Sequence, residues 1–140
     1  MLERIIAIVR SAGEIVRSAQ DVTAHTHLKT SAADLVTDYD VAVEKYLKKE
    51  LLSLLPDAIF YGEEEEEHSN PNVGWAFIVD PIDGTTNFVR GFRQSAISVA
   101  LLKDGELRYA VIYDPGKDEL FSAEKGKGAF LNGKAIHVSA

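Results

Sequence analysis

The segment Trp75-Ala76-Phe77-Ile78-Val79-Asp80-Pro81-Ile82-Asp83-Gly84-Thr85-Thr86-Asn87 divides into an apolar half and a polar half. The continuous apolar run up to Val79 predicts a strand that is buried on both faces and ends at Asp80. Asp80 and Asp83 then lie three residues apart across a turn stiffened by Pro81, so their carboxylates can converge. The sequence therefore predicts a pair of acidic side chains at the end of a core strand.

The turn after this strand offers oxygen ligands and backbone amides. Two carboxylates and the carbonyl of Ile82 favour a hard cation, magnesium before manganese or calcium, and argue against structural zinc. Gly84 has no Cβ, so a phosphate can approach the backbone, and Thr85 follows with an amide and a hydroxyl. The alternative is an Asp-Pro-x-Asp-Gly surface turn that binds no metal.

Two further acidic clusters precede this segment. Glu63 begins a run of five glutamates directly after the strand-like Ala58–Gly62. If that strand neighbours the one ending at Asp80, the Glu63 carboxylate can reach the same site, whereas the later glutamates are interpreted as a solvated loop. Asp40 follows Thr37 at the start of a predicted helix, where its ordinary role is to cap the helix and complement its dipole.

The first half of the chain predicts two helices. Apolar residues recur at helical spacing over about residues 2–20, which predicts a first amphipathic helix. Residues 23–33 are polar and without a clear period, so we expect a loop, with or without a short hairpin. A second helix is predicted from the cap residue Thr37 to Pro56, which stops it.

The second half of the chain predicts an antiparallel sheet. Strand-like segments are joined by three hairpin signals, namely Asp104-Gly105, Asp114-Pro115-Gly116-Lys117 and Asn132-Gly133. With the strands that precede them, they predict an α+β fold in which two helices pack on a sheet of about six strands. We expect residues 1–140 to form a single domain.

The composition excludes several function classes. Fifteen basic and twenty-two acidic residues give a net charge of −7, so we expect no nucleic-acid polymer as partner. The chain has no cysteine, hence no disulfide framework and no thiolate metal site, which agrees with a cytoplasmic location. No run approaches the ~20 apolar residues of a membrane span, and no signal peptide is recognisable, so no membrane partner is expected.

Three weaker patterns do not qualify as binding motifs. Gly126-x-Gly128 begins like a dinucleotide loop, but Leu131 stands where the third glycine should be and strand-like residues follow. His25 and His27 alternate in the polar loop and are interpreted as facing solvent, not zinc. The acidic spacing of a calcium-binding EF-hand is absent.

Four motifs, in order along the chain, closely resemble the inositol monophosphatase family. They are Asp34-Leu35-Val36-Thr37-x-x-Asp40, Gly62-Glu63-Glu64, Trp75 through Phe88, and Gly126-Lys127-Gly128-Ala129-Phe130-x-Asn132-Gly133. The resemblance implies the first half of a layered sugar-phosphatase fold. Residues 1–140 would be the amino-terminal, metal-binding half, and the tryptophan-aspartate motif of the family's second half does not occur in the sequence.

The same resemblance implies a magnesium site. The side chains of Glu63, Asp80 and Asp83 and the carbonyl of Ile82 would be metal ligands. A complete enzyme would bind two or three magnesium ions. The second half of family members supplies another ligand and the residues that hold the sugar or polyol.

The resemblance also implies groups that hold the phosphate and the attacking water. The amides of Gly84 and Thr85 would bind the substrate phosphate, and Glu63, Ile82 and Asp83 are counted with them as substrate-binding positions. The Thr85 hydroxyl and Asp40 would orient the water beside Glu63. Lys29 would lie near that network and completes the predicted catalytic set.

We therefore expect magnesium-dependent, lithium-sensitive hydrolysis of a small phosphate ester by metal-activated water. Inositol monophosphate is the first substrate to consider, and other sugar or nucleotide phosphates of the same superfamily stay open. The alternative is a truncated, non-catalytic half-domain that folds and self-associates. Apolar surface left uncovered by a missing half would favour association, and a homodimer is expected.

Overall fold

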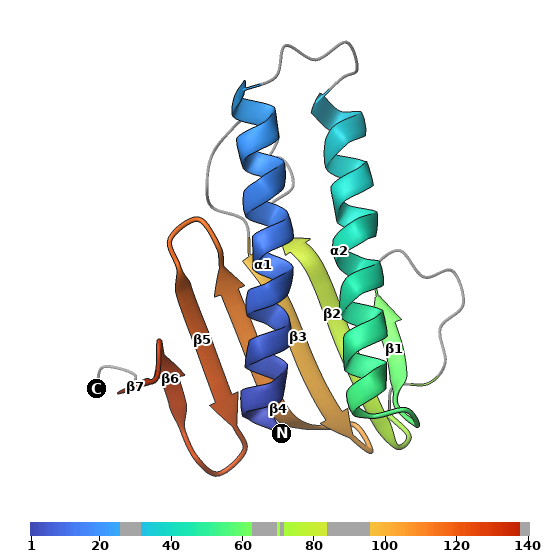
Figure 1. Cartoon of the computed structure of the whole chain (residues 1–140). Helices are drawn as coiled ribbons and strands as arrows, with labels where there is room; N and C mark the ends of the chain where they lie inside the picture. The colour runs from blue at the N-terminus through green and yellow to red at the C-terminus, as the bar shows by residue number, and fades with distance from the viewer. Residues whose placement is uncertain (26–31, 63–69, 71, 84–95, 138–140) are drawn as a thin grey trace.

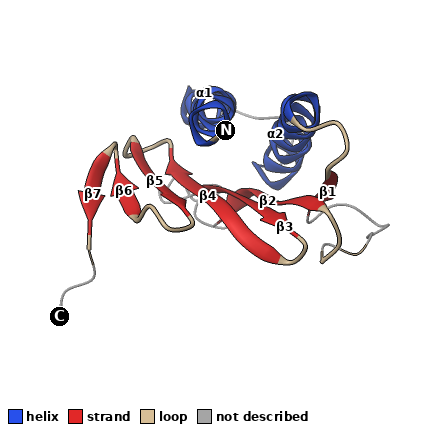
Figure 2. Ribbon diagram, turned by 90° about the horizontal axis from the view of Figure 1, so that it is seen from below, coloured by secondary structure: helices blue, strands red, loops and turns tan. Residues whose placement is uncertain are grey.

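Two helices precede seven strands in the part of the chain that the computed structural model describes. That part is residues 1–25, 32–62, 70, 72–83 and 96–137, with the side chains of 19–25, 32–40 and 81–83 outside the description. The elements are α1 (Leu2–His25), α2 (Ala32–Leu54), β1 (Ile59–Gly62), β2 (Trp75–Asp83), β3 (Ala96–Lys103), β4 (Glu106–Asp114), β5 (Glu119–Glu124), β6 (Ala129–Leu131) and β7 (Lys134–Ile136). Both helices lie on the same face of one sheet, which gives two layers (Figures 1 and 2).

The strands lie in the sheet in the order in which they occur in the sequence, from β1 to β7. β1 pairs with β2 in parallel, and every later pair is antiparallel. The expected α+β fold, with two helices packed on a sheet, is confirmed. The sheet has seven strands in the described residues, where about six were expected, and it is mixed rather than antiparallel because β1 and β2 are parallel. Twelve residues separate β1 from β2, which is long enough for the return that a parallel pair requires.

Two of the predicted hairpins have the backbone geometry that their sequences favour. Asp104 and Gly105 have φ of 50° and 81° between β3 and β4, and Asn132 and Gly133 have φ of 49° and 83° between β6 and β7. Two successive positive φ values are the requirement of the type I′ turn, which matches the twist of the strands it joins. The third signal is also confirmed, because the chain turns after Asp114 and enters β5 at Glu119.

The helix boundaries differ from those predicted. α1 continues to His25, and α2 begins at Ala32, five residues before the expected cap. Thr37 and Asp40 therefore lie inside α2, and their assignment to a helix start is wrong. Ala32 and Ala33 have the highest intrinsic preference for the helix, and this outweighs the polar pattern around them. None of the described helices is long and apolar enough to cross a membrane.

The core lies between the helices and the face of the sheet that they cover. α1 contributes Ile5, Val9, Ala12 and Val16, and α2 contributes Val43, Leu47 and Leu51. Alternate strand residues point toward these stripes, namely Phe77, Val79, Ile97, Val99, Leu101, Val111, Tyr113 and Leu120.

The opposite face of the sheet has no helix over it among the described residues (Figure 2). Ile78 on β2 is 38% exposed, Ile112 on β4 45% and Phe121 on β5 39%. The prediction that the strand after Trp75 is buried on both faces is therefore wrong. We call this surface the open face. Asp80, Ser98, Ile112 and Phe121 form a continuous row across it, each directly opposite the next on neighbouring strands.

Tyr113 connects α1 to the turn after β4. A Cβ at Gly13 of α1 would lie only 2.5 Å from its ring, so the helix approaches the sheet closely here. The Tyr113 hydroxyl donates a 2.7 Å hydrogen bond to Oδ1 of Asp118 and accepts one of 2.7 Å from Nη2 of Arg17. Burial raises the pKa of Tyr113 above its ordinary 10.0, and the hydrogen bond to Asp118 raises it further.

We expect the stabilisation provided by this hydroxyl to disappear in alkaline solution. Because the Tyr113 pKa is higher in the folded than in the unfolded chain, its contribution is complete below pH 10.0 and falls as the pH rises through the folded value. Tyr113→Phe should lower the free energy of unfolding by about 1 kcal/mol at neutral pH. Urea unfolding of both proteins from neutral to alkaline pH tests this, and a difference that stays constant above pH 10.0 contradicts it.

Candidate functional site

The carboxyl end of β1 lies beside the part of β2 that leads into Asp80. The two strands are parallel, and Gly62, the last residue of β1, pairs with Val79 of β2. Asp80 follows Val79 and Glu63 follows Gly62 in the sequence. The condition that we attached to Glu63, that its strand must neighbour the strand leading to Asp80, is therefore met. Glu63 itself lies outside the described residues.

β2 does not end at Asp80, as predicted, but continues to Asp83 through a bulge. Asp80 pairs with Ser98 and Asp83 with Ala96, so three steps along β2 correspond to two along β3. Pro81 explains the irregularity, because it has no N–H to donate to the ladder and is tolerated in a strand mainly at such interruptions. Ser98 and Ala96 lie on the same face of β3, so the bulge places Asp80 and Asp83 opposite residues of one face.

α2 packs on β1 and β2, and it lies against Gly62, the last residue of β1. Figure 1 shows both strands pointing toward the end of the molecule at which α2 begins. Glu44, in the middle of α2, is only 9% exposed, and a Cβ at Gly62 would overlap its Oε1. Asp40 lies one turn earlier on the same helix, about 6 Å further along its axis. The structure describes only the backbone of Asp40.

Of the predicted site residues, Asp80, Ile82 and Asp83 lie on β2 and Asp40 lies on α2. Among these four, the structure describes only the side chain of Asp80, which is half-buried on the open face. The remaining predicted residues, Lys29, Glu63, Gly84 and Thr85, lie outside the described residues. Among the side chains that are described, no group of three histidine or carboxylate residues is placed to hold a metal.

Glu44 was not among the predicted site residues. It stands on the apolar stripe of α2, between the buried Val43 and Leu47. The sequence does contain a signal for Glu44, because it places a charged residue within the apolar stripe of a helix. Glutamate is almost never buried without a specific reason.

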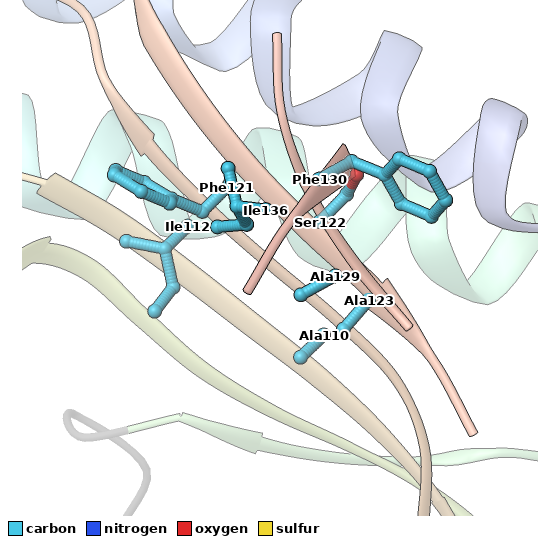
Figure 3. Close-up of a pocket in the computed structure, with 8 residues that line it drawn as sticks. All are labelled: Ala110, Ile112, Phe121, Ser122, Ala123, Ala129, Phe130 and Ile136. Atoms are coloured by element: carbon cyan, nitrogen blue, oxygen red, sulfur yellow. The ribbon is translucent and has the colours of Figure 1, made fainter. Parts of the chain in front are cut away.

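The open face carries an apolar hollow farther along the sheet. It is lined by side chains of β4 to β7, among them Ala110, Ile112, Phe121, Ala129, Phe130 and Ile136. Figure 3 shows Ile112, Phe121 and Ile136 close together in this hollow. Apart from Ser122 the lining residues are apolar, and such a lining suits packing against another apolar surface.

The comparison with protein families gives a match over the whole chain. A model of the inositol monophosphatase family matches residues 1–140. Inositol-1-monophosphatase of Rhizobium meliloti (strain 1021) is 45% identical over 108 residues, which are 77% of this chain and 41% of that protein. Inositol monophosphatase 1 of Sus scrofa is 38% identical over 143 residues, which are 99% of this chain and 51% of that protein.

A solved structure agrees with these sequence matches. The extragenic suppressor protein suhB of Bartonella henselae superposes with a TM-score of 0.85 at 36% identity. The match covers 99% of this chain and 53% of that one. The chain therefore spans about half the length of the relatives that it matches.

Proposed function

Because the chain belongs to the inositol monophosphatase family, we propose that it carries the metal-binding part of a magnesium-dependent phosphomonoesterase. Inositol monophosphate is the proposed substrate, since the relatives at 38–45% identity are named for that activity. The observation that supports the proposal most is the parallel pairing of β1 with β2, which brings Gly62 beside Val79.

The strand register supports a shared site for three acidic residues. Gly62 and Val79 are buried on the helix-covered face, so by alternation the next residue of each strand, Glu63 and Asp80, would face the open side. The bulge would turn Asp83 to the same side as Asp80. Three carboxylates and the Ile82 carbonyl make an all-oxygen set, which fits magnesium.

The chain's own groups would bind and orient the reactants. When bound, magnesium would supply Lewis-acid activation and offset the repulsion between the acidic site and the phosphate. The amides of Gly84 and Thr85 would hold the phosphate. The Thr85 hydroxyl and Asp40 would orient the water for in-line attack, with Lys29 near them.

Two measurements test this function on the 140-residue chain. Phosphate release from inositol monophosphate should require magnesium and should fall when lithium is added. Binding of manganese, used as a paramagnetic substitute for magnesium, should be detectable by electron paramagnetic resonance. A chain that neither releases phosphate with magnesium nor binds manganese contradicts the proposal.

The open face supports a second candidate, a half-domain that self-associates without hydrolysing phosphate esters. Ile78, Ile112 and Phe121 leave apolar surface in contact with water, and two copies could cover it mutually. This candidate differs from the first in requiring no metal.

A further inference from the structure

Glu44 is a carboxylate residue that is buried among apolar side chains of α2. The residue is 9% exposed, and Oε1 exposes less than 1 Å². Removing a carboxylate from water costs several kcal/mol, and buried charged groups rarely repay that cost in net stability. An apolar residue would suit the stripe between Val43 and Leu47 better, so stability alone does not explain a glutamate at this position.

Glu44 lies against the last residue of β1, which is Gly62. A Cβ at Gly62 would overlap Oε1 of Glu44 and lie 3.1 Å from its Cδ. Gly62 is not one of the glycines with positive φ, so the position needs glycine for space and not for its backbone angle. The carboxylate therefore lies directly against the backbone of the strand end.

The contact joins two elements that the proposed site requires at a fixed distance. α2 carries Asp40 one turn before Glu44, and β1 leads directly into Glu63. Groups behind a metal site hold its ligands in place, and their loss typically costs ~10–100-fold in metal affinity. A side chain that fixes β1 against α2 is in the position to act in this way.

We propose that Glu44 is a positioning residue. Its buried carboxylate fixes the carboxyl end of β1 against α2 and thereby sets where Glu63 leaves the strand relative to Asp80. The expected effect on metal binding rests on the proposed function. The Glu44–Gly62 contact does not depend on that function. Glu44 touches neither substrate nor metal in this proposal.

The first experiment compares Glu44→Gln, which keeps the shape and removes the charge, with Glu50→Gln on the same helix. Glu50 is only partly buried and serves as the matched control. Manganese titration followed by electron paramagnetic resonance should show ~10–100-fold weaker binding for Glu44→Gln and no change for Glu50→Gln. Thermal unfolding of the metal-free proteins shows whether a change in overall stability accounts for the difference.

The second experiment is independent of any metal. Hydrogen exchange of the metal-free chain should be faster in Glu44→Gln at the amides of Gly62 and Val79, with β4 and β5 unchanged. In the otherwise wild-type chain, Gly62→Ala should also accelerate hydrogen exchange at the end of β1. In a Glu44→Ala background, Gly62→Ala should accelerate exchange less, because the carboxylate that would clash with the new Cβ is gone. Such non-additivity is the signature of a direct contact.

The outcomes are distinguishable. Unchanged manganese affinity together with unchanged exchange in Glu44→Gln overturns the inference, as does an affinity loss that Glu50→Gln shares. If the wild type binds no manganese while exchange at the end of β1 accelerates in Glu44→Gln, the proposed function of this chain fails and the positioning role of Glu44 stands.

Discussion

Replacing Asp80 with asparagine will lower magnesium-dependent phosphate release by at least ~100-fold. Mutation of a residue that only supports a metal ligand can already lower metal affinity or activity by that factor, and Asp80 is a proposed ligand itself. Asparagine keeps the size and one acceptor oxygen of the side chain but removes the negative charge that a hard cation requires. Since Asp80 is half-buried on the open face and not in the helix-covered core, the fold should be retained. The expected change is therefore in metal binding and turnover, with little change in unfolding.

The measurement is phosphate release as a function of magnesium concentration, with manganese binding on the same samples. Asp57→Asn is the matched control, because Asp57 is an exposed aspartate before the start of β1, away from the carboxyl ends. It should behave as the wild type in both assays. Near-normal magnesium-dependent turnover in Asp80→Asn would remove Asp80 from the metal site and, with it, the assignment of the neighbouring positions.

The features predicted correctly from the sequence were local ones. The pairs Asp104-Gly105 and Asn132-Gly133 specify positive φ angles at two neighbouring residues, and this requirement acts within the turn itself. The end of β1 at Gly62 was also predicted from its immediate neighbours. Such features depend on side chains a few residues apart, so a single sequence contains the information.

The features that were missed depend on distant parts of the chain. Pro81 and Asp83 have the composition of a turn, yet β3 pairs with this segment and extends the strand through a bulge. The parallel partner of β2 lies beyond a twelve-residue connection that carries no hairpin signal. The contact of Glu44 with Gly62 likewise forms only when α2 packs on the sheet.

For the candidate site, sequence and structure supply different parts. The residue types of the segment from Asp80 to Thr85 indicated the chemistry, and the resemblance assigned the roles. The structure adds that β1, which precedes Glu63, lies beside β2, which contains Asp80. The sequence alone does not show that these two strands are neighbours, because nothing local to either strand specifies its partner.

On the open face, Phe121→Glu should abolish self-association of the 140-residue chain. Phe121 lies directly opposite Ile112 on the neighbouring strand, and both are among the exposed large apolar residues. If two copies cover their open faces mutually, a carboxylate at this position would be buried without a partner. The cost of several kcal/mol corresponds to an affinity loss of at least ~100-fold.

Sedimentation equilibrium of wild type and variant over a range of protein concentrations measures this loss directly. Val73→Glu is the matched control, because Val73 is 62% exposed and lies before the start of β2, so the same charge is added outside the strands that carry Ile112 and Phe121. Its association should equal that of the wild type. A wild-type chain that is monomeric at every concentration would show that a second copy does not cover Ile112 and Phe121, and the self-associating half-domain would lose the observation that supports it.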